Sequence, residues 1–440
     1  VASHPVVFTT KTPYTLPSQK FMIPLDWKRY QLSQLINKAL SLPKPIPFDF
    51  LVQGEILRTS LAEWRAERGV GEEETLEIEY FESVLPPQRM SVLPHEDWVS
   101  SVSCRIPQHL LTASYDGHIR LFDYSQKPIR DIAAHLAPIT SVCVVPTPES
   151  ADDSIIVATA SHDLTACLTQ VSLAPGAAAP YHALASLHLH TSPLSSISSD
   201  STGSNLLTAS WDTLIGFWDT QIPPQDEIAP DPTDRKKRRK IGNAGSDADR
   251  ARRKAPTTVL KSHTARVSKA LFAPGSRERA VSCGFDSTVR TWDVESGVCV
   301  DTITVPERPM LDLALTPDGH TALASSTDRT VSIFDLRSSA LSRTTGTLAH
   351  PSTPSCLVCP STASSAQTQV ITGAYDGIAR LWDLRSTKSA VASFKAWSAS
   401  GTESGAMKIL SVDWAGDVVG IGGEGGVEVW RVGQGERAGK

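Results

Sequence analysis

Serine or threonine, histidine and aspartate recur together along this 440-residue chain, and these are the side chains of a nucleophile–base–acid triad. The aspartates share the third position of a ten-residue motif and stand at Asp116, Asp163, Asp212, Asp286, Asp328 and Asp376. Histidines precede several of them, at His135, His190, His263 and His350. A hydrolase needs one such set, whereas here the repeat gives most copies a similar set. We therefore interpret the sets as scaffold rather than as active sites.

The spacing of this motif predicts the fold. Its Asp positions, together with Glu424 in a weaker seventh copy, are separated by 47, 49, 74, 42, 48 and 48 residues. The strong copies end in Phe-Asp or Trp-Asp after alternating apolar residues, which is the pattern of a packed strand. A period in the forties with this ending is typical of four-stranded propeller blades. The sequence therefore predicts seven blades.

The motif resembles that of the WD-repeat family. In this family the His, Asp, Ser or Thr and Trp residues form a hydrogen-bonded structural network in each blade, which offsets the cost of burying a carboxylate. The resemblance implies a structural role for the six aspartates, covered by aromatic residues such as Trp218, Trp292 and Trp382. The second copy departs most from the pattern, with Thr169 where the Trp belongs.

The first 85 residues lack the repeat and read as a separate domain. Hydrophobic periodicity and turn signals predict strands and helices in the order ββαβ(β)αβ, at Val6–Thr10, Phe21–Leu25, Tyr30–Leu40, Phe48–Val52, Gly54–Arg58, Ser60–Gly69 and Thr75–Phe81. This order resembles the ubiquitin-like β-grasp, an α+β fold.

The predicted protein is mainly β, with a seven-bladed WD-repeat propeller preceded by a ubiquitin-like domain. We expect the ubiquitin-like domain in 1–85, a linker and candidate ring-closing strand in 86–94, the propeller in 95–432 with an insertion at 226–254, and a C-terminal tail in 433–440. The last copy leaves no sequence for its outermost strand, so Met90–Leu93 is expected to fill that place and to remove an exposed edge.

The charge is distributed unevenly. The net charge is −5, but residues 234–254 hold ten Lys or Arg against three Asp, so the rest of the chain sums to −12. The basic residues are Arg235, Lys236, Lys237, Arg238, Arg239, Lys240, Arg250, Arg252, Arg253 and Lys254. A segment of this composition predicts a mobile loop that suits a nuclear import receptor. A merely solvated loop and a contact with RNA phosphates are the alternatives.

Other classes of function have little support in the sequence. No run of about 18 apolar residues suggests a membrane span. The seven cysteines form no disulfide framework, and Cys356 and Cys359 lie in an apolar run where core packing is favoured over metal binding. Walker, G-x-S-x-G and H-E-x-x-H motifs are absent from the sequence. We expect no enzyme activity, no intrinsic cofactor and no metal held by this chain alone.

A run of carboxylates, Glu72, Glu73 and Glu74, directly precedes the last strand of the first domain. Charge alone indicates a solvated turn. The chain is, however, similar over nearly its whole length to the WD-repeat subunits of Pescadillo–Bop–WD (PeBoW-type) complexes, which carry an N-terminal ubiquitin-like (NLE-type) domain. The similarity lies in the domain order, in the basic insertion and in Asp26–Tyr30, Phe48–Leu51, Leu57–Leu61, Leu85–Pro87 and Glu96–Ser101.

This resemblance implies a non-enzymatic assembly factor of the large (60S) ribosomal subunit, required for pre-rRNA processing, in the nucleolus and nucleoplasm of the nucleus. Its propeller would dock to a Bop-type WD-repeat subunit, which joins a Pescadillo-type subunit on the pre-60S particle. Its ubiquitin-like domain would be bound by the AAA+ ATPase midasin for release. In that contact Glu73, with Glu72 and Glu74 as alternates, would coordinate a Mg²⁺ ion held by midasin. The alternative function is a WD-repeat substrate receptor in ubiquitin signalling.

Overall fold

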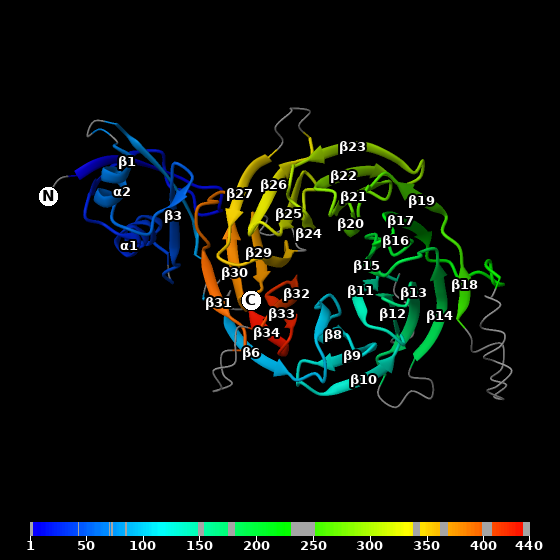
Figure 1. The fold of residues 1–440 in the computed structure, drawn as a ribbon. Helices are drawn as coiled ribbons and strands as arrows, with labels where there is room; N and C mark the ends of the chain where they lie inside the picture. Colours follow the sequence, from blue (N-terminus) through cyan, green and yellow to red (C-terminus); the bar gives the residue numbers. More distant parts are fainter. Residues whose placement is uncertain are drawn as a thin grey trace.

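The chain folds into a small N-terminal domain beside a ring of seven sheets (Figure 1). The computed structural model describes residues 3–42, 44–69, 71, 74–83, 86–147, 154–174, 181–229, 251–337, 344–360, 368–397 and 407–433. The mainly β fold class predicted from the sequence, a WD-repeat propeller preceded by a ubiquitin-like domain, is confirmed. Neither helix in the described part is both long enough and apolar enough to cross a membrane.

The N-terminal domain is a five-stranded sheet in the order β2-β1-β5-β3-β4, with the central pair β1 and β5 parallel. Its elements are β1 (Ser3–Thr9), β2 (Lys20–Pro24), α1 (Arg29–Leu40), β3 (Phe48–Val52), β4 (Glu55–Ile56), α2 (Leu61–Arg68) and β5 (Leu76–Glu82). Leu32 and Ile36 of α1 pack on Phe48 and Tyr80 of the sheet, whose rings meet edge to face at 5.6 Å. This burial of one sheet face gives the domain its own core.

Each blade contains four antiparallel strands, which are consecutive in the chain except in blades 3 and 7. Blades 1, 2 and 3 comprise β7 (Val99–Ser103), β8 (His109–Ser114), β9 (His118–Asp123) and β10 (Pro128–Ala133); β11 (Ile139–Val145), β12 (Ser154–Ser161), β13 (Thr165–Ser172) and β14 (Tyr181–His188); and β15 (Leu194–Ser199), β16 (Asn205–Ser210), β17 (Leu214–Asp219) and β19 (Thr258–Lys261). Blade 2 carries a fifth strand, β18 (Arg252–Lys254), parallel to β14.

The remaining blades follow the same plan. Blades 4, 5 and 6 comprise β20 (Val267–Phe272), β21 (Arg279–Gly284), β22 (Thr288–Asp293) and β23 (Val298–Thr304); β24 (Met310–Leu315), β25 (Thr321–Ser326), β26 (Thr330–Asp335) and β27 (Thr344–Ala349); and β28 (Pro354–Val358), β29 (Gln369–Ala374), β30 (Ile378–Asp383) and β31 (Ala392–Lys395). Blade 7 comprises β32 (Ile409–Ala415), β33 (Val418–Gly423), β34 (Gly426–Arg431) and β6 (Gln88–Leu93).

The ring is closed by β6, which precedes blade 1 in the sequence but forms the outermost strand of blade 7. It pairs antiparallel with β34, with Leu93 opposite Val427. Leu93 is 2% exposed and packs in one cluster with Val427 and with Val99 of blade 1. Met90–Leu93 therefore lies in the strand that closes the ring, as the sequence predicts.

Blades 2, 3 and 4 contain the hydrogen-bonded network implied by the family resemblance. In blade 4, His263 Nδ1 lies 2.8 Å from the Asp286 carboxylate and Nε2 lies 2.7 Å from Ser282 Oγ. The indole N–H of Trp292 donates to the same Oγ at 2.7 Å. The sequence predicts that the aromatic ring covers the Asp. Its indole N–H, however, bonds the Ser282 hydroxyl and not Asp286. Blade 3 repeats this arrangement with His190, Asp212, Thr208 and Trp218.

Blade 2 keeps the network without a Trp. His135 Nδ1 lies 2.7 Å from Asp163 and Nε2 lies 2.8 Å from Thr159 Oγ1. Burial is the largest single influence and disfavours the charged imidazole, but the interactions with Asp163 and Cys167 together outweigh it and raise the pKa of His135 to about 10. The divergent second copy therefore keeps the His, Asp and Thr contacts of the network.

In blades 1 and 6 the motif aspartate pairs with an arginine, whereas in blades 2, 3 and 4 it pairs with a histidine. Arg120 pairs with Asp116 and Arg380 pairs with Asp376, each at 2.6 Å. His350 bonds Thr372 and the Leu348 carbonyl instead of the Asp, and His95, which the sequence analysis missed, does the same with Thr112 and Leu93. His95 lies 21 residues before Asp116, a spacing close to that of His190 and Asp212, which was the available signal.

The prediction that all the motif aspartates are buried is only partly correct. The side chains of Asp212 and Asp286 are 5% and 3% exposed. Those of Asp116, Asp163, Asp328 and Asp376 are 19–28% exposed, since they lie in turns where an arginine or water can reach them. Blade 5 has no histidine in this role, and Arg308 pairs with Asp328 at 3.0 Å.

We predict that Ser282→Ala lowers the free energy of unfolding by about 1–3 kcal/mol, because it removes the hydroxyl shared by the buried His263 and Trp292 nitrogens. Urea unfolding of the full chain, followed by Trp fluorescence, measures this. The matched control is Ser325→Ala, since the buried Ser325 hydroxyl has no hydrogen-bond partner among the described residues. Equal destabilisation by both substitutions would contradict a network role for Ser282.

A second prediction concerns pH. Burial lowers the pKa of His350 to about 4, whereas a histidine in the unfolded chain has a pKa of about 6.5. As the pH falls from 6.5 to 4, the unfolded chain gains a proton that the folded chain does not, so stability decreases. The free energy of unfolding, measured by urea titration over this range, should fall by about 1–3 kcal/mol more for the wild type than for His350→Gln. Parallel pH profiles would contradict this assignment.

Candidate functional site

The acidic loop, Gly71–Glu74, lies between α2 and β5. Helix α2 starts at the capping hydroxyl of Ser60 and ends at Gly69, which adopts φ 65° and donates its N–H to the Arg65 carbonyl. Glycine at this position stops the helix cleanly. Gly71 and Glu74 are exposed, and Glu74 forms no ion pair within the described part of the chain. Glu72 and Glu73 lie outside the described residues.

The prediction that the whole basic insertion is a mobile loop is wrong at its ends. Arg252–Lys254 form β18, hydrogen-bonded in parallel to β14 of blade 2. The Arg253 N–H donates to Asp226 at 2.9 Å and its carbonyl accepts from the Glu227 N–H at 2.9 Å. Residues at both ends of the insertion are therefore joined to each other and to the blade.

Lys254 is also not a solvated cation. It is 3% exposed, and its ammonium contacts Asp219 and the carbonyl of Gln221. These partners lie more than thirty residues away in the sequence, so its charge looked unpaired there. The other predicted import residues divide between Arg252 and Arg253, which lie in β18, and Arg235–Lys240 and Arg250, which lie outside the described residues.

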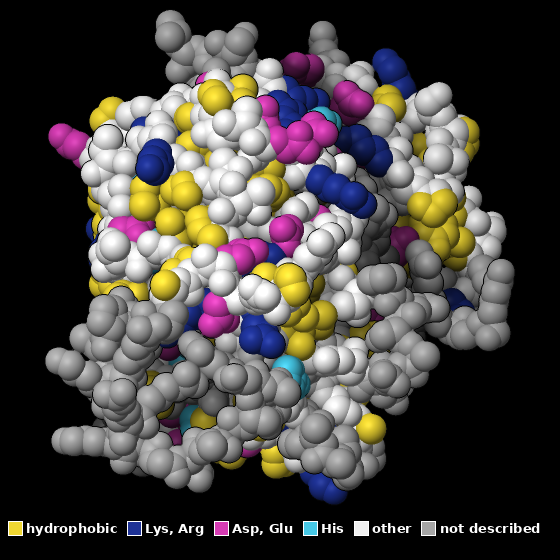
Figure 2. Space-filling view, turned by 90° about the vertical axis from the view of Figure 1, so that its right-hand side faces the viewer, with side chains coloured by type: hydrophobic (Ala, Val, Ile, Leu, Met, Phe, Trp, Pro, Cys, Tyr) yellow, Lys and Arg dark blue, Asp and Glu magenta, His cyan; other side chains and the backbone are white. Residues whose placement is uncertain are grey.

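Figure 2 shows the side of the molecule that carries blades 2 and 3. Basic and acidic side chains are interspersed over the described surface of this view, with hydrophobic side chains between them (Figure 2). This mixture is not the continuous basic face that a general nucleic-acid-binding surface needs.

Exposed aromatic residues gather at one end of the propeller. The turn between the second and third strands of each blade and the loop that enters the next blade lie at the same end of the ring. Here Trp98 is 42% exposed and its ring lies 6.0 Å from that of Tyr115. The ammonium of Lys408 lies 5.9 Å from the Trp98 ring and 5.6 Å from the Tyr375 ring. We call the exposed side chains at this end the aromatic face; it comprises Trp98, Tyr115, Tyr375 and Lys408 and a second group around Trp211 and Arg266.

A second group lies across blades 2, 3 and 4 at the same end. The Arg266 guanidinium stacks 3.5 Å from the Phe285 ring centre and 5.3 Å from that of Trp211, which is 43% exposed. His162 lies 5.5 Å from the Trp211 ring, and Leu136 nearby is fully exposed. Aromatic and arginine side chains of this kind are typical of the centres of protein–protein interfaces.

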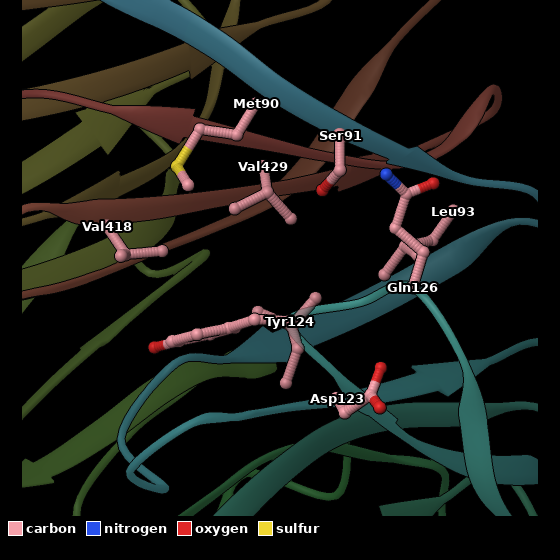
Figure 3. Close-up of a pocket in the computed structure, with 9 residues that line it drawn as sticks. Met90, Ser91, Leu93, Asp123, Tyr124, Gln126, Val418 and Val429 are labelled. Atoms are coloured by element: carbon pink, nitrogen blue, oxygen red, sulfur yellow. The ribbon is translucent and has the colours of Figure 1, made fainter.

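A cavity of about 90 Å³ lies where blade 7 meets blade 1 (Figure 3). Met90 of the closing strand and Val418 and Val429 of blade 7 line one side, and Tyr124 approaches from the β9–β10 turn (Figure 3). Binding sites for small molecules have volumes of about 300–1,000 Å³. This cavity is therefore a packing gap at the ring closure rather than a candidate ligand site.

The residues that suggested enzyme or metal chemistry are structural. Ser282 and Ser210 are fully buried, and the repeated His, Asp and hydroxyl groups hold turns together. Cys356 and Cys359 are 5% and 9% exposed in two different hydrophobic clusters, as predicted, and burial raises the pKa of each thiol to about 12. Among the described residues there is no group of three or more His, Cys, Asp or Glu that could hold a metal ion.

The sequence has clear relatives. Residues 5–64 match the NLE (NUC135) domain model, and residues 87–123, 182–219, 254–293 and 297–335 match the WD domain, G-beta repeat model. The chain is 60% identical to the ribosome biogenesis protein YTM1 of Laccaria bicolor, over 99% of this chain and 96% of the relative. It is 56% identical to that of Coprinopsis cinerea over 97% and 94% of the two chains.

The similarity extends to more distant fungi. The YTM1 protein of Saccharomyces cerevisiae is 30% identical over 83% of this chain and 82% of its own length. These identities extend over most of each chain, and they show that the proteins are homologous. This chain belongs to the YTM1 family of ribosome biogenesis proteins.

Proposed function

We propose that this chain is a non-enzymatic assembly factor of the large (60S) ribosomal subunit that supports pre-rRNA processing. Its relatives carry the name ribosome biogenesis protein, which supports a role for this chain in ribosome biogenesis. In this proposal the propeller holds a Bop-type subunit, which joins a Pescadillo-type subunit on the pre-60S particle. The ubiquitin-like domain is bound by the AAA+ ATPase midasin, which removes the complex from the particle.

The observation that carries the proposal is the placement of the acidic loop. It leaves a helix stopped at Gly69 and enters β5 at Leu76, so two ordered elements of one compact domain flank its carboxylates. Glu74 at its end is exposed. A carboxylate held this way can approach a partner without unfolding the domain that carries it.

Magnesium is the proposed link. Mg²⁺ is a hard ion that prefers six oxygen ligands in near-octahedral geometry and often retains water molecules. An adhesion-type domain of midasin that holds Mg²⁺ with one replaceable ligand would accept a carboxylate oxygen from Glu73. The resulting bond has a defined direction and suits the transmission of force. The metal would belong to the partner, with this chain supplying one ligand.

We predict that Glu73→Ala weakens binding of the full chain to the adhesion-type domain by about 2 kcal/mol or more, roughly 30-fold in Kd, because the metal loses a charged ligand. Calorimetry with Mg²⁺ and with a chelator measures this, and circular dichroism checks the fold. Glu72→Ala and Glu74→Ala are the matched controls. A loss confined to either control would keep the mechanism but move the ligand. Binding that survives both chelation and a triple alanine variant would refute it.

The propeller is proposed to dock the Bop-type subunit through its aromatic face. Arg266 forms no ion pair within the described part of the chain and can offer its guanidinium edge to a carboxylate. Trp211 and Trp98 supply the large apolar contacts that dominate binding energy at protein interfaces.

Trp211→Ala combined with Arg266→Glu should weaken binding of the Bop-type propeller by about 2–4 kcal/mol, measured as Kd by calorimetry or interferometry. Tyr124→Ala is the control, since Tyr124 is 50% exposed in the β9–β10 turn at the opposite end of the ring. If only the Tyr124 variant lost binding, the opposite end would be the docking face.

Nuclear and nucleolar localisation is part of the proposal. The basic run Arg235–Lys240, with Arg250, Arg252 and Arg253, would serve as an import signal or contact rRNA. Lys254 is excluded from that role because it is buried against Asp219.

The alternative, a substrate receptor in ubiquitin signalling, would use an exposed apolar patch on the β-grasp sheet. On the outer face of β5 the residues before Phe81 are acidic, Glu77 and Glu79, and Phe81 is only 7% exposed. This surface favours the assembly factor over the ubiquitin receptor.

A further inference from the structure

The outer face of the ubiquitin-like sheet lies against blade 6. The segment 384–391, which we call the clamp loop, connects β30 to β31 on that blade. The N-terminal domain stands beside the outer strands of blades 5 and 6, at β27 and β31 (Figure 1). The contacts between the clamp loop and this domain include hydrogen bonds, ion pairs and the stacking of an arginine on an aromatic ring.

Arg385 is the centre of the contact. Its guanidinium is held on the propeller side by Asp383, with distances of 2.6 and 3.0 Å to the two carboxylate oxygens. On the domain side it donates to Glu79 at 3.3 Å and lies 4.3 Å from the centre of the Phe81 ring. Asp383 is fully buried, so Arg385 links a buried carboxylate of the blade to Glu79 of the domain.

Further contacts surround this centre. The Ile56 N–H of edge strand β4 donates to Ser386 Oγ at 3.4 Å. Glu55 pairs both with Lys388 of the clamp loop and with Arg68 of α2, and the Arg58 guanidinium donates to the Ala390 carbonyl. These partners come from β4, from the residues after it and from the clamp loop, so both sides contribute charges of both signs.

Burial shows that the contact covers apolar surface. Phe50, Val52 and Tyr80 point into the core of the domain, so Leu51 and Phe81, next to them in the strands, point to the opposite face. Leu51 is 3% exposed and Phe81 is 7% exposed, although neither belongs to that core. The propeller therefore supplies the cover for the outer face of β3 and β5.

We propose that the clamp loop locks the ubiquitin-like domain onto blade 6 as a rigid handle, so that force applied at the acidic loop reaches the propeller through this contact. The proposal rests on the proposed function for the source of the force. The acidic loop and Phe81 lie toward opposite ends of β5, and Phe81 is five residue steps along the strand from Leu76, about 17 Å. Glu74, at the end of the loop, is thus exposed while the other end of the same strand is held.

Hydrogen exchange of the full chain tests the docking directly. The Ile56 amide is a reporter, because its hydrogen bond is to Ser386 of the propeller. We predict that Glu55→Lys or Lys388→Glu alone raises exchange of the peptide containing Ile56 about threefold. The double variant should exchange more slowly than either single variant but not at the wild-type rate, because the pair of Glu55 with Arg68 of α2 stays lost. Lys395→Glu, at an exposed lysine of the same blade, is the control. Unchanged exchange in both single variants, or no rescue in the double variant, would overturn the docking.

Binding and release separate this inference from the proposed function. Both single variants should bind the adhesion-type domain of midasin as the wild type does, but should leave the particle more slowly in an ATP-driven release assay, with the double variant partly restored. Release at the wild-type rate from variants that exchange fast would overturn the mechanical role. Failure of the wild-type chain to bind the adhesion-type domain, with the charge-swap result intact, would refute the proposed function and leave the docking standing.

Discussion

Gln88–Leu93 is both the connection that leaves the ubiquitin-like domain and the outermost strand of blade 7. Its pairing with β34 removes the free edge that an open ring would expose, and Leu93 joins the last blade to Val99 of the first. Because β6 belongs to blade 7, the chain before it must lie at the outer rim near blades 6 and 7. The position of the small domain beside the clamp loop follows from ring closure.

The blades share one geometric requirement and meet it with different side chains. The turn after each second strand carries an acid that needs a partner, which is histidine in blades 2, 3 and 4, an arginine four residues on in blades 1 and 6, and Arg308 from the preceding loop in blade 5. Most buried polar groups in proteins have such partners. Beside these acids, Trp211 and Tyr375 are exposed in the turns after second strands, and the exposed Trp98 contacts the half-buried Tyr115; all four belong to the aromatic face.

Local signals predicted most of this architecture. The regular return of Asp116 and its equivalents identified the blades, and alternation in Thr75–Phe81 identified the last strand of the small domain. Contacts between residues far apart in the chain could not be predicted from the sequence. Lys254 resembled a solvated cation because Asp219 lies 35 residues away, and the contact of Arg385 with Glu79 joins residues 306 apart. For the candidate site, the sequence alone located the acidic loop, while the aromatic face required the ring to bring its turns to one end.

The central claim is that the acidic loop is the point where an ATPase holds this chain while blade 6 receives the load. The most direct measurement is a structure of the full chain bound to the adhesion-type domain of midasin with Mg²⁺. We expect a carboxylate oxygen from Glu72–Glu74 in the coordination sphere of the metal, with Arg385 still between Asp383 and Glu79. A complex in which the acidic loop faces solvent and the partner binds elsewhere would contradict it.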